Sequence, residues 1–156
     1  MMNKLVLILS VSFLLVAGSG CTKNEVCQPK TVQSEEAAIL SYAAANGITA
    51  TKHPSGMYYQ IINQGSGPTP SITSTLSVKY TGKLTNGTIF DQRITSPISF
   101  PLSGVIGGWQ LGLPLIQKGG TIKLIIPSSF AYGCEGKGSI PPYSILFFEI
   151  ELVDVL

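Results

Sequence analysis

The segment LSVKYT at residues 76–81 decides the fold, because its apolar and polar residues alternate strictly. Leu76, Val78 and Tyr80 fall on one face of an extended chain and the intervening residues fall on the other, which predicts a strand with one buried face. Asn86-Gly87 follows shortly afterwards and is typical of a hairpin turn. We therefore expect this segment to begin an antiparallel hairpin.

Further strands are predicted on both sides of this segment. Residues 121–126 and 146–152 carry apolar residues at every even-numbered position, with Thr, Lys or Glu at most of the positions between them. Residues 57–62 form another compact β-prone run. Strands with one buried face are typical of antiparallel sheets, so we expect all of these segments to join one such sheet.

A short helix is expected between the strands, at residues 108–116. Trp109, Leu113 and Ile116 are four and three residues apart, which places them on one face of a helix. Pro114 would strain the end of this helix, because proline has no N–H to donate. Together the elements predict an α+β fold: a curved antiparallel β-sheet wrapped around one short α-helix, with an N-terminal helical extension.

The N-terminal residues 1–20 are interpreted as an export signal and not as part of the fold. Lys4 precedes an apolar run over 5–17, which is shorter than the roughly 20 residues of a membrane-spanning helix. Gly18-Ser19-Gly20 then leads to Cys21, and this arrangement resembles a bacterial lipoprotein signal in which the cysteine becomes the lipidated first residue. The alternative is an ordinary cleaved signal with an unmodified Cys21.

The rest of the chain divides by composition and pattern. Ser34 offers a helix N-cap and Asn46-Gly47 a helix stop, which predicts a helix over 34–46 with Glu35 and Glu36 in its first turn, where the helix dipole favours acidic residues. Polar residues without periodicity precede this helix and predict a tether. The expected organisation is a signal at 1–20, a tether at 21–33, a helix and linker at 34–55, and the main domain at 56–156.

The composition excludes several classes of protein. The chain is 44% hydrophobic and 12% charged, as expected of a compact domain. Ten Lys and Arg against eight Asp and Glu give a formal net charge of +2, and no two basic residues are adjacent. The basic patch of a nucleic-acid-binding protein is therefore missing, and we expect no nucleic-acid partner.

Metal sites and hydrolytic sites lack the residues that they require. His53 is the only histidine, it precedes Pro54 in a polar linker, and the chain has no Cys-x-x-Cys pair. We expect no metal and no cofactor. Cys27 and Cys134 remain once Cys21 is set aside, and disulfides persist in exported proteins, but the spacing does not decide whether these two cysteines pair.

The main domain contains four motifs in a fixed order. They are VKYTGKL at 78–84 followed by Gly87, Phe90 and Asp91; VIGGW at 105–109; AYG at 131–133 followed by IPP at 140–142; and LFFEIEL at 146–152. Together they resemble the FKBP-type peptidyl-prolyl isomerases, the FK506-binding family. Four ordered motifs are a specific signal, whereas Tyr-Thr-Gly alone would be a weak one. With its N-terminal signal, the chain resembles a bacterial lipoprotein form of this family.

This resemblance implies an apolar pocket with Trp109 as its floor. The residues expected to act in catalysis are Tyr80, Phe90, Asp91, Trp109, Tyr132 and Phe148, and those expected to bind substrate are Ile98, Phe100, Val105, Ile106 and Ile140. For each aromatic residue taken alone, plain core packing is the alternative. Asp91 has a different alternative, a hairpin-end residue in water. The chain departs from better-known relatives in three places. Ile98 replaces an aromatic residue, the segment 102–105 is tightened with Leu111 where an acidic residue is common, and the short loop 134–139 carries Lys137 in place of a histidine.

The function implied by the resemblance is peptidyl-prolyl cis-trans isomerisation, which needs neither a cofactor nor a catalytic base. The expected substrates are proline-containing polypeptides exported to a bacterial cell envelope, and FK506-like macrolides are a possible second class of ligand. We expect membrane attachment through a lipid on Cys21, and Thr22 in place of an aspartate favours the outer membrane. The alternatives are a non-catalytic FKBP-like peptide-binding or chaperone module, and an unrelated carrier of apolar ligands.

Changing Cys21 to alanine should move the protein from the membrane fraction to the soluble fraction, because the expected lipid is attached to that side chain. Cell fractionation followed by detection of the protein in each fraction measures the change. If the Cys21→Ala variant stays with the membrane, the lipoprotein interpretation is wrong.

Overall fold

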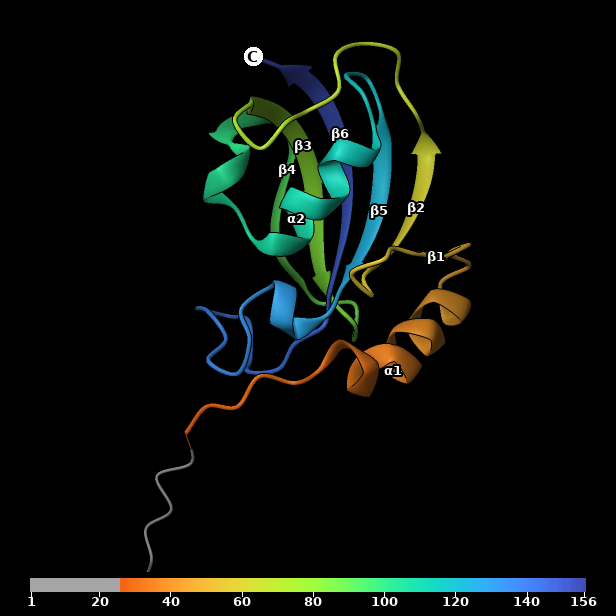
Figure 1. The fold of residues 1–156 in the computed structure, drawn as a ribbon, viewed down its shortest axis with the longest axis vertical. Helices are drawn as coiled ribbons and strands as arrows, with labels where there is room; N and C mark the ends of the chain where they lie inside the picture. Colours follow the sequence, from red (N-terminus) through yellow and green to blue (C-terminus); the bar gives the residue numbers. More distant parts are fainter. Residues whose placement is uncertain (1–25) are drawn as a thin grey trace, which may run out of the picture.

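The computed structural model of the protein describes residues 26–156, so the predicted signal at 1–20 and the predicted lipidation site Cys21 lie outside the described residues. Six strands form one antiparallel sheet in the order β1-β2-β5-β6-β3-β4 (Figure 1). Their bounds are β1 Thr51–Lys52, β2 Tyr58–Asn63, β3 Thr75–Leu84, β4 Ile89–Pro101, β5 Thr121–Ile126 and β6 Leu146–Val155. In the described part of the chain, no helix is both long and apolar enough to cross a membrane.

The hairpin predicted at Asn86-Gly87 is present and joins β3 to β4. The Leu84 amide donates to the Thr88 carbonyl at 2.9 Å and closes the turn. β3 pairs with β4 on one side and with β6 on the other, so it lies in the interior of the sheet. The predicted α+β class with a curved antiparallel sheet is confirmed.

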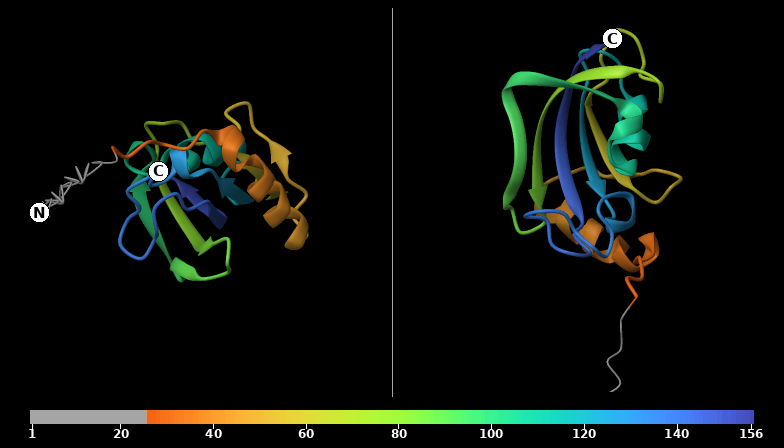
Figure 2. Two further views of the ribbon diagram at one scale, coloured as in Figure 1. Left: turned by 90° about the horizontal axis from the view of Figure 1, so that it is seen from below. Right: turned by 90° about the vertical axis from the view of Figure 1, so that its left-hand side faces the viewer.

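The inner helix α2 lies in the hollow of the curved sheet (Figure 2). It spans Gly107–Gly112 and continues as a 3-10 turn over Leu113–Leu115, whereas the sequence predicted a single helix over 108–116. Pro114 explains the difference, because its missing N–H cannot make the α-helical hydrogen bond while a short 3-10 turn tolerates it. The predicted helix is therefore correct in place and too long at its end.

Close packing between α2 and β5 depends on a glycine. A Cβ atom at Gly108 would lie 2.4 Å from Cγ2 of Ile126, closer than two carbon atoms can approach. Glycine at this position lets the helix backbone rest directly on the sheet. Trp109, the next residue, is then pressed against the inner face and is only 5% exposed.

The sheet buries apolar side chains on both of its faces. Leu124 and Ile126 belong to the main core on the inner face, beneath α2, whereas Ile125 between them belongs to a second cluster on the outer face. Phe147 of β6 also joins the outer cluster, while its two neighbours in the sequence join the main core. The outer cluster needs a cover, and the N-terminal helix provides it.

That helix, α1, spans Val32–Ala45 and contributes Ile39 and Ala43 to the outer cluster. The predicted helix began at the N-cap Ser34, but the structure places the N-cap at Thr31, whose Oγ1 accepts a hydrogen bond from the Ser34 amide at 3.3 Å. Threonine is also a good N-cap, so the sequence contained two adequate start signals and the earlier one is used.

Both acidic residues in the first part of α1 make specific contacts that the dipole argument did not predict. Glu35 is only 3% exposed, and its Oε2 accepts a hydrogen bond from the Ser128 amide at 2.8 Å. Glu36 accepts from Lys52 Nζ at 2.6 Å and from the Tyr58 hydroxyl at 2.5 Å. These contacts fix α1 to the sheet and to the segment that follows β5.

Cys27 and Cys134 form a disulfide, with their Cα atoms 5.6 Å apart, which answers the question that their spacing left open. Lys30 reinforces the attachment, since its Nζ lies 5.1 Å from the centre of the Tyr143 ring. Both contacts hold the segment before α1 against the loop between β5 and β6 (Figure 1).

Reducing the disulfide should destabilise the domain, because the cross-link closes a loop over a sequence separation of 107 residues. Loop-closure entropy for a cross-link of this span is worth about 4 to 5 kcal/mol of unfolding free energy. In a Cys21→Ala background, which leaves only this pair of cysteines, a reductant should lower the urea midpoint. The Cys27→Ser/Cys134→Ser variant should show the lower midpoint with or without reductant. An unchanged midpoint of the paired form under reductant would contradict this expectation.

Candidate active site

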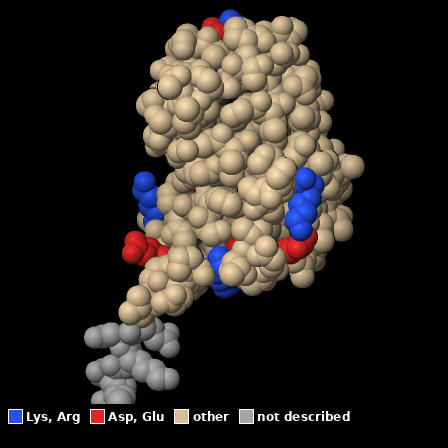
Figure 3. Space-filling view, in the orientation of Figure 1, with Lys and Arg blue, Asp and Glu red and all other residues tan. Residues whose placement is uncertain are grey.

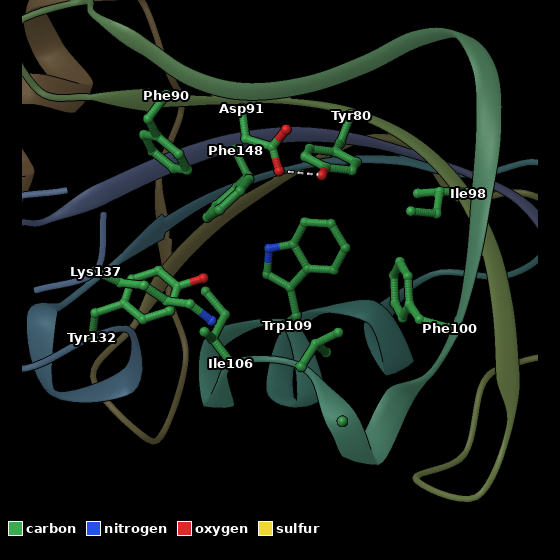
Figure 4. Close-up of a pocket in the computed structure, with 12 residues that line it drawn as sticks. Tyr80, Phe90, Asp91, Ile98, Phe100, Ile106, Trp109, Tyr132, Lys137 and Phe148 are labelled. Atoms are coloured by element: carbon green, nitrogen blue, oxygen red, sulfur yellow. Dashed lines mark hydrogen bonds between the residues drawn. The ribbon is translucent and has the colours of Figure 1, made fainter. Parts of the chain in front are cut away.

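A cavity of about 230 Å³ opens on the inner side of the sheet, between α2, β4 and the loop after β5. Ten of the eleven residues that the sequence predicted for catalysis or substrate binding line it (Figure 4). Its complete lining is Tyr80, Phe90, Asp91, Ile98, Phe100, Gly104, Val105, Ile106, Trp109, Tyr132, Lys137 and Phe148. The fold thus brings residues from β3, β4, β6, α2 and two loops to one place.

Trp109 forms the floor of the cavity and is surrounded by other aromatic rings. Its indole meets the Tyr80 ring edge-to-face at 5.1 Å between centroids and the Phe148 ring edge-to-face at 5.2 Å. Phe100 lies 5.4 Å from the indole on another side, and Phe90 packs edge-to-face on Phe148 at 5.5 Å. These are favourable arrangements for ring quadrupoles, so the walls hold one another in fixed orientations.

Asp91 and Tyr80 form the polar side of the cavity. The Tyr80 hydroxyl donates to Asp91 Oδ2 at 2.5 Å, while Arg93 Nη1 lies 3.9 Å from Oδ1. The Asp91 side chain is 49% exposed: it stands at the edge of water and also faces the aromatic cavity (Figure 4). Burial, and next the hydrogen bond to Asp91, raise the pKa of Tyr80 far above its ordinary value. The Tyr80 hydroxyl therefore remains a donor at neutral pH.

Besides the Lys137 amine, three hydrogen-bond donors at the cavity lack an acceptor within residues 26–156. The Ile106 amide and the Tyr132 hydroxyl make no hydrogen bond there, and neither side chain is fully buried. Burial, and next the negative charge of Asp91, raise the pKa of Tyr132, so this hydroxyl too remains protonated. The third donor, Trp109 Nε1, is buried and inaccessible to solvent.

Ile140 is the one predicted residue that does not line the cavity. Its side chain is 7% exposed and belongs to the main core. Its amide, which the resemblance suggested as a donor to substrate, instead donates to the Lys137 carbonyl at 2.9 Å. The structure therefore does not bring Ile140 into the cavity lining, and its amide is already paired within the loop; substrate binding by Ile140 stays a prediction.

Sequence reasoning missed two lining residues, Gly104 and Lys137. The sequence alone gives no sign that Gly104 lies at the wall, since it ends the short 3-10 turn Leu102–Gly104, whose path depends on the fold. Lys137 was noted only as a departure from relatives, although its position in the short loop after the AYG motif was a usable signal. Ile98 lines the cavity as predicted but is 38% exposed, so this wall is open.

The loop that carries Tyr132 and Lys137 is held by α1 and its preceding segment. Glu35 binds the amide of Ser128, the first residue of the 3-10 turn Ser128–Phe130 that leads into this loop. The disulfide then fixes Cys134, two residues after Tyr132. The N-terminal part of the chain therefore supports one wall of the cavity.

The charges around the domain are sparse and mixed in sign. Figure 3 shows a face that is mostly uncharged, with blue and red atoms close to one another near its lower end. Residues 26–156 contain no group of three or more His, Cys, Asp or Glu side chains placed to hold a metal ion. The cavity therefore offers aromatic surface, a few hydrogen-bonding groups and two opposite charges as its chemistry.

Comparison with known proteins connects this cavity to a family. Residues 67–153 match the family model described as FKBP-type peptidyl-prolyl cis-trans isomerase. The chain is 44% identical over 117 residues to the FKBP-type 22 kDa peptidyl-prolyl cis-trans isomerase of Escherichia coli (strain K12), and the match covers 73% of this chain and 56% of that protein. The chain spans about half the length of such relatives.

Solved structures agree with the sequence matches. The crystal structure of FkpA from Escherichia coli has a TM-score of 0.71 and 41% identity, over 80% of this chain and 60% of that chain. A peptidyl-prolyl cis-trans isomerase from Pseudomonas syringae pv. tomato has a TM-score of 0.68 and 34% identity, over 82% of this chain and 98% of that chain. Since the matched residues include every residue that lines the aromatic cavity, the chain belongs to the family of FKBP-type peptidyl-prolyl cis-trans isomerases.

Proposed function

We propose that this protein is a peptidyl-prolyl cis-trans isomerase that accelerates rotation about X-Pro bonds in exported polypeptides. The observation that carries the proposal is the cavity floored by Trp109, enclosed by aromatic rings and bordered by donors without a partner in the described chain. At about 230 Å³ it is smaller than most sites for drug-sized ligands and suits a single ring such as that of proline.

The chemistry of the X-Pro bond explains why such a cavity would be a catalyst. Rotation must break amide resonance and crosses a barrier of about 18 to 20 kcal/mol, so it takes tens to hundreds of seconds unaided. Water stabilises the planar, charge-separated form of the amide. A dry aromatic site favours the twisted, less polar form, and a reduction of the barrier by about 4 kcal/mol gives roughly a thousandfold acceleration.

The proposed roles follow from where each side chain stands. Trp109, Phe90, Phe148 and Ile98 would surround the prolyl ring and keep water away from it, and Phe100 and Val105 would extend this apolar surface. The Tyr132 hydroxyl and the Ile106 amide would donate to substrate carbonyls. Asp91, oriented by the Tyr80 hydroxyl, would polarise the twisted bond and would not remove a proton, because the reaction transfers none.

The proposal extends to the location of the enzyme in the cell. We propose that a lipid on Cys21 anchors it in a bacterial cell envelope, with the outer membrane favoured by Thr22, and that its substrates are proline-containing proteins folding there. The support is the apolar run at 5–17 followed by small residues and a cysteine. FK506-like macrolides are proposed as ligands from the family resemblance, although the open wall at Ile98 reduces the apolar surface available to them.

The protein should accelerate the isomerisation of a short X-Pro peptide, and variants of the cavity should separate packing from catalysis. Phe148→Ala should lower activity and also cost about 3 to 5 kcal/mol of unfolding free energy, because Phe148 is only 4% exposed. Phe90 is less buried, so the loss of stability for Phe90→Ala should be smaller. Asp91→Ala should lower turnover with little effect on stability, since this side chain is 49% exposed.

Peptide isomerisation kinetics and urea unfolding, measured on each variant, test these assignments. Asp154→Ala is the matched control, because it removes a similarly exposed aspartate that pairs with Lys118 outside the cavity. A fully active, folded Asp91→Ala variant would overturn the role of Asp91. Peptide binding without any acceleration would favour the non-catalytic peptide-binding module.

A further inference from the structure

Lys137 brings a positive charge into the wall of an otherwise aromatic cavity. Its Nζ lies 5.4 Å from the centre of the Tyr132 ring, and its side chain lines the cavity together with Tyr132 and Ile106 (Figure 4). Within residues 26–156, no carboxylate oxygen lies within 4.0 Å of this amine. The ring face of Tyr132 orients the ammonium group but leaves its charge unneutralised.

The backbone beneath Lys137 is fixed, so the amine projects from a rigid base. The Lys137 amide donates to the Ile140 carbonyl and the Ile140 amide donates back to the Lys137 carbonyl, both at 2.9 Å. Gly136 has a φ of 70°, and a Cβ atom there would lie 2.4 Å from the Ile140 oxygen. The disulfide at Cys134 holds the same loop from its other end. Binding of a partner then has to order the side chain of Lys137 but not its backbone.

The acidic side of the cavity is already compensated, and the basic side is not. Asp91 accepts a hydrogen bond from Tyr80 and has the Arg93 guanidinium 3.9 Å away. Lys137 has no such partner in the described chain. A substrate bound over Trp109 therefore meets one unpaired charge next to the prolyl ring, and that charge is positive.

We infer that Lys137 is a specificity-determining residue that selects proline-containing substrates with an acidic side chain within two residues of the proline. This inference rests on the proposed function for its substrate class. The carboxylate of Asp or Glu would pair with the Lys137 amine while the prolyl ring occupies the aromatic cavity. Because Lys137 is exposed, the expected preference is modest, about two- to fivefold, and salt should weaken it.

The experiment compares short peptides that carry either Glu or Gln at each of the two positions on either side of one proline. The Cys21→Ala full chain is assayed for kcat/KM on every peptide, at low and at high salt. At one or more positions the Glu peptide should exceed its Gln counterpart two- to fivefold at low salt, and the ratio should fall towards one at high salt. Lys137→Gln should abolish the ratio, Lys137→Arg should keep it, and Lys137→Glu should invert it.

Lys30→Gln is the matched control, because Lys30 is also an exposed lysine over a tyrosine ring but does not line the cavity. This variant removes the same charge and should leave the Glu/Gln ratio unchanged. If Lys137→Gln lowers kcat/KM equally for all peptides, Lys137 only orients Tyr132 and the inference is overturned. A wild-type ratio of one at every position also overturns it.

Binding separates failure of this inference from failure of the proposed function. Trp109 is the only tryptophan of the chain and forms the cavity floor, so its fluorescence reports peptide binding without any need for turnover. If no peptide is isomerised but Glu peptides still bind more tightly than Gln peptides in a Lys137-dependent way, the proposed catalysis fails and the selectivity stands. If peptides are isomerised with no charge preference in either measurement, the proposed catalysis stands and the selectivity of Lys137 fails.

Discussion

The contact between α2 and the sheet at Gly108 is the constraint on which the cavity depends. A side chain at this position would push the helix away from β5, and Trp109 would then lose its place against Tyr80 and Phe148. The indole is at once part of the main core and the floor of the site. For this residue, core packing and substrate binding are therefore not competing explanations, because the same rings that stabilise the domain present their remaining faces to the cavity.

A second constraint acts from the opposite face of the sheet. Ile125 and Phe147 point to the outer face of the sheet, where the flanking outward-facing positions of β5 and β6 are polar. The helix α1 buries these two apolar side chains. Once docked, α1 places the Glu35 carboxylate under the segment that leads to Tyr132. The N-terminal extension thus links the outer face of the sheet to a wall of the cavity, although it contributes no lining residue itself.

Much of the fold could be predicted from the sequence, because strict alternation in 76–81 and the turn at Asn86-Gly87 are local signals with a simple physical basis. The site residues came from the family resemblance, and ten of them line the cavity. What could not be predicted depends on long-range contacts: the disulfide, the Glu35 contact with Ser128, and the turn that takes Ile140 into the core. Burial of the sheet on both faces could have been predicted, because three consecutive apolar residues at 124–126 and at 146–148 are typical of strands buried on both faces.

The attachment at Cys27 also sets how far the domain can travel from an anchor. A lipid on Cys21 would leave only five residues, and so six Cα-to-Cα steps, between the anchored residue and Cys27 of the disulfide, and an extended chain covers at most about 3.3 to 3.6 Å per step. The reach is then roughly 20 Å, shorter than the hydrocarbon core of a bilayer is thick. Because Cys134 lies in the same loop as Tyr132, the side of the domain that carries the cavity loop would be held near the lipid surface. Such an enzyme would work on chains at the membrane interface, with its range of action fixed by a covalent bond within the domain.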